Sequence, residues 1–297
     1  MNKLVKRLTG ILAAGLMLMA AGCGGRPQEP EQSTPETTSA PVVLPEASAL
    51  YAAALEKIEA EKSVACSLEM EMIQSSAGTT ITVPVKAKIE AQEKEGVTLL
   101  HMLMNMSMMG QTINMEMWQD GEYNYVSASG QKLKTPVTDD AEFQLPEDEL
   151  KELEETLSSS MKENSTVTAR DDGGYLVTSS IPGEKIKDLL KAAMEMAGGA
   201  DLESMEKISF SNIDLSLIFD KDQMMRSLSM KIGIEGETEM PDINDPEKTV
   251  KNKMTLSFDA TVSLDKYGAD VTVTLPEDLD AYQEMPTMDD EFVMEEI

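Results

Sequence analysis

The chain has 297 residues, 41% of them hydrophobic, which is enough apolar material for a folded core and excludes disorder along its whole length. Acidic residues outnumber basic ones 54 to 25, and the net charge of −29 is the reverse of what binding to a phosphate backbone requires. We therefore expect no nucleic-acid partner. One histidine and two cysteines nearly exclude His/Cys metal sites, Cys–His dyads and a disulfide framework by counting.

The amino terminus has the three parts of an export signal. Basic residues at Lys3, Lys6 and Arg7 precede an apolar run over 8–21 that is too short to span a bilayer comfortably. The run ends in Ala-Ala-Gly before Cys23, which looks like the lipobox of bacterial lipoproteins, whose cysteine receives a diacylglyceryl group and becomes the new amino terminus. An ordinary cleaved signal or an uncleaved anchor is the alternative. We expect removal of residues 1–22 and a lipid anchor on Cys23, which tethers the chain to the outer side of a membrane.

The lipid-bearing cysteine is followed by a spacer. Residues 23–45 contain five prolines among Ser, Thr, Glu and Gln, a composition that cannot bury a core. Residues 1–22 carry three basic groups and no acidic one, so their removal leaves a charge of 22 − 54 = −32. Repulsion from anionic head groups then holds the folded domain away from the membrane surface.

The first half of the folded region predicts a helix followed by antiparallel strands. Apolar residues recur at helical spacing over 48–62. They then alternate with period two, and Asp120–Gly121 is a strong signal for a two-residue hairpin turn. These patterns predict a meander of about five strands, over 66–72, 81–91, 100–108, 113–117 and 123–125.

The second half predicts two further helices and more strands. Helical spacing recurs over 146–161 and 182–197, on either side of a short hairpin over 166–179. A switch of apolar parity after Phe210 predicts a bulge or bend that curves the sheet. The remaining strands are expected over 208–219, 228–234, 250–264 and 269–275.

Two acidic segments are expected to be solvated. Residues 235–249 are interpreted as a loop, with a Ca²⁺ site as the weaker alternative because the EF-hand spacing is missing. Residues 277–297 are interpreted as a solvated tail. Together with the strands and helices, these boundaries predict one α+β domain over 46–276: a single large curved antiparallel sheet of about ten strands, an open half-barrel, with three helices covering its apolar face.

This order of elements resembles the lipoprotein-carrier superfamily, which includes the LolA and LolB carriers and the mycobacterial LppX and LprG lipoproteins. The comparison rests on the strand-turn-strand MWQDGEYNYV at 117–126, on Asp220-Lys221-Asp222 between two long strands, and on YGADVTVTLP at 267–276. The resemblance implies a domain that holds acyl chains between a half-barrel and its helices, and it favours a Gram-positive cell surface. It supplies no ligand-contacting motif that transfers residue by residue.

Methionines mark the candidate ligand site. Many of the 24 methionines fall on the apolar parity of neighbouring predicted strands, and their flexible, polarizable side chains suit a cavity for variable apolar ligands. Plain core packing is an equally good interpretation, and Cu(I) binding by thioethers is a third. The expected cavity lining is Met70, Met72, Met102, Met104, Met106, Met108, Met115, Met117, Met230 and Phe258.

No signature of catalysis accompanies these features. Cys66 lies on an apolar parity and is expected to be buried and inert, and His101 to be structural. We therefore expect a non-catalytic lipoprotein without a metal or a cofactor that binds a lipid or other hydrophobic molecule. The alternative is a structural or interaction module at the cell surface with a filled core and an unknown protein partner.

Overall fold

The computed structural model describes residues 44–76, 79–108, 110–137, 158–185, 206–242 and 245–285. The expected signal peptide, Cys23 and nearly all of the spacer lie outside the described residues, as do most of the two helices expected over 146–161 and 182–197. Within the described ranges, no helix is both long and apolar enough to cross a membrane.

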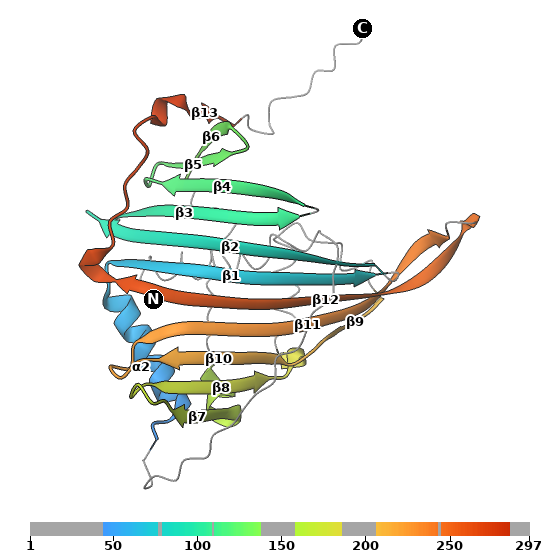
Figure 1. The fold of residues 1–297 in the computed structure, drawn as a ribbon, viewed down its shortest axis with the longest axis horizontal. Helices are drawn as coiled ribbons and strands as arrows, with labels where there is room; N and C mark the ends of the chain where they lie inside the picture. The colour runs from blue at the N-terminus through green and yellow to red at the C-terminus, as the bar shows by residue number, and fades with distance from the viewer. Residues whose placement is uncertain are drawn as a thin grey trace.

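A thirteen-stranded sheet forms the body of the molecule (Figure 1). Its order is β13-β6-β5-β4-β3-β2-β1-β12-β11-β10-β8-β7, with β9 also paired to β11, and all pairs are antiparallel except β13 with β6. The strands are β1 (Ser63–Ser76), β2 (Thr79–Lys94), β3 (Val97–Met108), β4 (Gln111–Gln119), β5 (Tyr123–Ala128), β6 (Gln131–Pro136), β7 (Ser165–Ala169), β8 (Tyr175–Ile181), β9 (Glu206–Phe210), β10 (Ile213–Phe219), β11 (Met225–Asp242), β12 (Asp245–Tyr267) and β13 (Gln283–Glu284).

The sheet is neither closed nor strongly curled, which corrects the expected half-barrel, and the described chain is mostly β rather than α+β. Bulges bend strands, but the register shifts after Ala65, Ile218 and Pro241 lie near strand ends, and the shift between Glu235 and Glu237 affects only the short ladder of β9 with β11. The expected strand over 269–275 joins no ladder in the described part of the chain, although Val271 and Val273 are buried.

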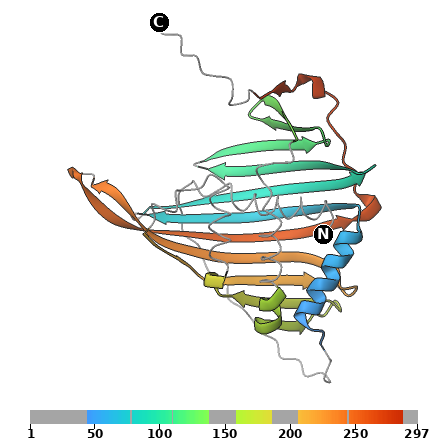
Figure 2. The same ribbon diagram turned by 180° about the vertical axis from the view of Figure 1, so that it is seen from behind.

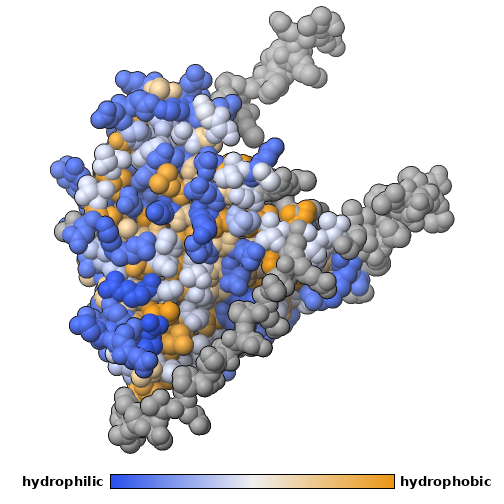
Figure 3. Space-filling view, in the orientation of Figure 1, coloured by the Kyte–Doolittle hydropathy of each residue, from blue (hydrophilic) through white to orange (hydrophobic). Residues whose placement is uncertain are grey.

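The inner face of the sheet carries the core and helix α2 (Ala47–Ala60) (Figure 2). The helix crosses the ends of β12, β11, β10 and β8 and reaches β7, and its apolar stripe of Leu50, Ala54 and Ile58 is buried. A second helical segment, 158–164, leads into β7 on the same face and buries Met161. The outer face, turned to the viewer in Figure 3, is a mixture of polar side chains and isolated apolar ones.

The parity switch after Phe210 is a break between two strands. β9 and β10 both pair with β11, and Ser211 separates them by exchanging hydrogen bonds with Gly233: its N–H donates to the Gly233 carbonyl over 2.7 Å, and its Oγ accepts from the Gly233 N–H over 2.7 Å. The structure therefore has an interruption between two strands at this point, in place of the expected bulge within one strand.

The described residues of the acidic segment, 235–242 and 245–249, are strand rather than the expected loop. They belong to a two-stranded ribbon of β11 and β12 that projects beyond the sheet (Figure 1). The ladder places Glu237 opposite Lys253, and the Lys253 ammonium lies 2.8 Å from the Glu235 carboxylate, which offsets acidic charge at the base of the ribbon.

Part of the expected acidic tail lies on the sheet. Residues 277–285 run along the outer face of β4, β5 and β6 and end in β13, and Tyr282 is only 4% exposed. The centroid of its ring lies 6.4 Å from that of Trp118 and 5.4 Å from that of Tyr125, and both contacts are edge-to-face. This cluster forms a small second core, which sequence reasoning missed because charge dominates the composition of the segment.

We predict that Tyr282→Ala loosens this segment at a cost of about 1–2 kcal/mol, because two edge-on aromatic contacts and their buried area are lost. Trp118 is the one tryptophan of the chain, so its emission should shift to the red as water reaches the ring. Tyr282→Phe keeps the ring and serves as the control; an unchanged emission spectrum in Tyr282→Ala would contradict the contact.

Candidate functional site

The predicted methionines share one face of the sheet. The ladder aligns Met230, Ala260, Met70, Val85, Met106 and Ile113 across β11, β12, β1, β2, β3 and β4 in a single row. The next row contains Met104 opposite Met115, the one after it Met102 opposite Met117, and Phe258 lies opposite Met72. These residues and Met108 have the parity of the inner face; the side chain of Met108 is outside the described set.

Burial decreases along this face from the centre of the sheet towards β4. Met70 and Met72 are 3% and 1% exposed and Phe258 is 8% exposed, so they belong to the closed core. Met102, Met104, Met106, Met115 and Met117, here called the methionine cluster, are only half-buried. The cluster lies beyond the strands that α2 crosses (Figure 2). The predicted lining thus splits into core residues and an apolar surface that remains partly accessible.

Cys66 is buried on the same face, as expected from its parity. It is 1% exposed, and burial, with a smaller contribution from the charge of Asp265, raises the pKa of its thiol to about 12. A thiol that stays protonated at neutral pH is a poor nucleophile.

We predict that Cys66 does not react with a disulfide reagent in the native protein at pH 8 and reacts rapidly once urea unfolds the chain. Reagent uptake by the native state of a chain that begins at Gly24, at a rate independent of urea, would contradict this burial.

His101 lies on the outer face, opposite in parity to Met102. Its Nε2 is 2.9 Å from a Glu116 carboxylate oxygen and its Nδ1 is 3.4 Å from Glu90, and its ring stacks on Trp118 with centroids 5.2 Å apart. These contacts join β2, β3 and β4 and agree with the structural role expected from the sequence. Among the described residues, no group of three or more His, Cys, Asp or Glu side chains is placed to hold a metal ion.

A hollow of about 580 Å³ opens on the outer face over β7, β8, β10, β11 and β12. Hydroxyl and charged side chains line much of it and pair locally: Ser180 donates to Asp214 over 2.9 Å, and Lys231 lies 3.6 Å from Asp259. Leu176, Leu215 and Met230 also line the hollow, so Met230 of the predicted lining lies here rather than beside the methionines of β3 and β4. The sequence patterns did not indicate this hollow.

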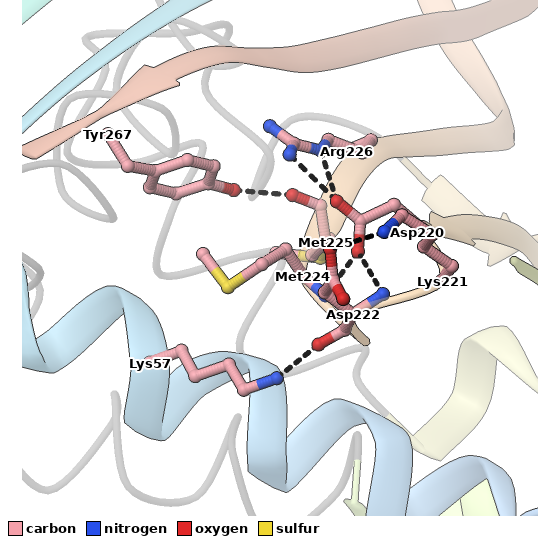
Figure 4. A network of polar contacts seen from close by, with 8 residues as sticks. All are labelled: Lys57, Asp220, Lys221, Asp222, Met224, Met225, Arg226 and Tyr267. Carbon is pink, nitrogen blue, oxygen red and sulfur yellow. Dashed lines mark hydrogen bonds and ion pairs between the residues drawn. The ribbon is translucent and has the colours of Figure 1, made fainter. Parts of the chain in front are cut away.

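A turn between β10 and β11 anchors α2 to the sheet (Figure 4). The Asp220 carboxylate accepts from the N–H groups of Asp222 (2.9 Å) and Met224 (3.0 Å) and from Arg226 Nε (2.8 Å). Lys57 of α2 donates to the Asp222 carbonyl, and the Tyr267 hydroxyl of β12 donates to the Met225 carbonyl. Asp220 therefore organises a turn that contacts both the helix and a neighbouring strand.

Partial burial of Asp220 disfavours its charged form, but the hydrogen bonds from Met224, Arg226 and Asp222 outweigh burial and hold its pKa below the ordinary value. Asp120, at the turn between β4 and β5, repeats the arrangement by accepting from the N–H groups of Glu122 and Tyr123 and from the Tyr125 hydroxyl, each over 2.8 Å. The pattern Asp-x-x-aromatic at 120–123 was the available signal for the second of these turns.

Comparison with solved structures gives distant similarities. LprF from Mycobacterium bovis aligns over 78% of this chain and 98% of its own at 11% identity, with a TM-score of 0.41. A DUF1329 family protein from Desulfovibrio piger aligns over 77% and 95% at 12% identity and a TM-score of 0.24. A putative outer membrane lipoprotein-sorting protein domain from Vibrio parahaemolyticus aligns over 78% and 94% at 8% identity and a TM-score of 0.20.

A comparison with curated proteins finds no match. A family model described as a family of unknown function, DUF6612, matches residues 46–277. These limits nearly coincide with the folded region 46–276 predicted from the sequence. They contain every strand of the described sheet except β13, and the described chain continues for eight residues beyond them, 278–285. The chain belongs to the DUF6612 family.

Proposed function

We propose that this protein is a non-catalytic, extracytoplasmic lipoprotein, anchored through Cys23, that binds a lipid or other hydrophobic molecule on the methionine cluster. The observation that carries the proposal is the decrease in burial along one continuous apolar face. The core closes around Met70 and Met72, whereas the methionines of β3 and β4 keep accessible surface.

An apolar ligand gains free energy on such a surface at about 25 cal/mol for each Å² removed from water. Methionine suits this task because its unbranched thioether side chain changes rotamer at little cost and follows ligands of different shape. The lipid anchor and the spacer would keep the domain within reach of a membrane, where such ligands reside.

The binding test is native mass spectrometry with lipid extraction on the chain from Gly24 onward, purified without detergent. We expect a bound species of lipid mass. We expect Met104→Glu with Met106→Glu to abolish it, because charged groups on this surface disfavour apolar contact.

The matched control changes Leu103 and Asn105 to Glu. These two residues alternate with the methionines on β3 but are exposed on the outer face. A bound lipid that survives the inner-face pair, or a clean ligand-free mass with no uptake of added lipid, would overturn the proposal.

The anchor has a separate test in cells. A chain with Cys23→Ser should lose incorporation of labelled fatty acid and leave the membrane fraction, whereas Cys66→Ser should retain both. Equal labelling of the two variants would contradict lipidation at Cys23.

A surface interaction module is the second candidate function. The β11–β12 ribbon favours this function. The ladder of β1 with β12 ends at Met254, and that of β9 with β11 ends at Glu237. Beyond these residues, β11 and β12 pair only with each other in the described ladder. Two-stranded ribbons are marginally stable alone, so a partner would stabilise this one. A ligand-free mass in the test above would favour this function.

A further inference from the structure

The methionine cluster places two pairs of thioethers directly across a strand ladder. Met102 is opposite Met117 and Met104 is opposite Met115. In an antiparallel pair, the Cβ atoms of opposite residues are about 4.5–5.5 Å apart and those of diagonal residues about 7–8 Å or somewhat less. Rotation about the Cα–Cβ and Cβ–Cγ bonds moves each sulfur by several ångströms, so three or four sulfurs can converge on one point above the strands.

Thioether sulfur is a soft, uncharged donor that selects soft cations such as Cu(I) over the hard ions bound by carboxylates. The described residues provide no cluster of His, Cys, Asp and Glu for another metal, so the thioethers are the concentrated donor set on this part of the sheet. The net charge of −29 raises the local concentration of any cation.

Accessibility distinguishes this cluster from the other methionines of the same face. Met70 is 3% exposed and lies between Val85 and Ala260 of the neighbouring strands. Met72 is 1% exposed and lies between Val83 and Phe258. Their sulfurs cannot turn towards an ion without disrupting the core. The four residues of the two opposite pairs are half-buried, which leaves room for an ion to enter while the sheet shields one side from water.

We propose that Met102, Met104, Met115 and Met117 bind a soft monovalent cation, Cu(I), through their thioether sulfurs. The inference does not depend on lipid binding. The step is coordination alone: no electron is transferred, and the sulfurs release no proton.

The test uses Ag(I), a soft monovalent ion that does not change oxidation state under these conditions, with the chain from Gly24 onward. Native mass spectrometry should show one retained Ag(I). Replacing the four methionines by leucine should abolish retention, because leucine conserves volume and apolarity but has no donor atom. Circular dichroism would verify that this variant keeps its sheet.

The matched control replaces Met70, Met72, Met225 and Met230 by leucine, the same number of substitutions at other sites, and should retain Ag(I). Peroxide footprinting gives a second readout: each free thioether takes one oxygen from hydrogen peroxide with release of water, and bound Ag(I) should protect the four sulfurs from this reaction. Retention of Ag(I) by the first variant, its loss from the control, or equal oxidation with and without Ag(I) would each overturn the site.

The leucine variant also separates this inference from the proposed function. Since its surface stays apolar, it should still take up lipid while it loses Ag(I). Loss of lipid with retained Ag(I) would count against the methionine cluster as a metal site, whereas loss of Ag(I) alone would support it.

Discussion

Met72→Lys should unfold or severely destabilise the protein, with an expected loss of about 4 kcal/mol or more. Met72 is 1% exposed and lies between Val83 and Phe258 of the neighbouring strands. A lysine there must bury an unpaired ammonium group or distort the core to hydrate it, and both cost several kcal/mol. The measurement is urea unfolding followed by circular dichroism on the chain from Gly24.

The matched variant is Met106→Lys, in the adjacent row of the same face. Met106 is half-buried, so a lysine can lay its aliphatic stem on the sheet and extend its charge to water at an expected cost of about 1 kcal/mol. Met72→Leu controls for the loss of the thioether and should cost less than about 1.5 kcal/mol.

The contrast between the two lysine variants measures the decrease in burial on which the proposed function rests. Similar losses at both positions would mean that the methionine cluster is as closed as the core, and the surface would then have no room for a ligand.

The inner face could be predicted from the sequence because side chains alternate strictly along a strand. Met70, Met104 and Met117 are assigned to one face by parity within each strand, and neighbouring strands of a meander pair in chain order. The structure places them as expected. Parity alone does not predict how deeply a row is buried, so core residues and accessible ones entered the predicted lining together.

The pairing of β1 with β12 could not be derived from local patterns. It joins Ser63–Ser76 to a strand nearly two hundred residues away, and nothing within either strand specifies the partner. Long-range pairing depends on the match of whole apolar faces, which single-sequence periodicity does not resolve.

Charge was over-weighted at two places. The opposite charges that pair across the β11–β12 ribbon, such as Glu235 and Lys253 at 2.8 Å, were a readable signal for a strand pair. In the C-terminal segment, Leu279 and Tyr282 stand among acidic residues, and both contribute to the second core.

Asp220→Ala should lower the free energy of unfolding at pH 7 by about 3 kcal/mol. The variant removes an ionised acceptor that binds two backbone N–H groups and Arg226. A buried hydrogen bond to a charged group contributes about 1.5–3 kcal/mol. Each of these three contributes less, because Asp220 is partly exposed. The turn that holds Lys57 of α2 would loosen at the same time, because the Asp222 carbonyl is positioned by this turn.

The effect should depend on pH in a defined direction. Since the pKa of Asp220 is lower in the folded protein than in the unfolded chain, where it is about 3.9, the ionised carboxylate stabilises the fold fully above that value. As pH falls through the lower, folded pKa, the stabilisation is lost. The difference in unfolding free energy between wild type and Asp220→Ala should therefore be constant from pH 7 to about 5 and shrink below about pH 4.

Asp222→Ala is the matched control within the same turn. Its side chain is exposed, while the N–H and carbonyl that serve Asp220 and Lys57 belong to the backbone and remain. It should change stability by less than about 0.5 kcal/mol at any of these pH values. If the difference in unfolding free energy between wild type and Asp220→Ala grew as pH falls, the lowered pKa of Asp220 would be contradicted. The charge-based account of how α2 is anchored to the sheet would fail with it.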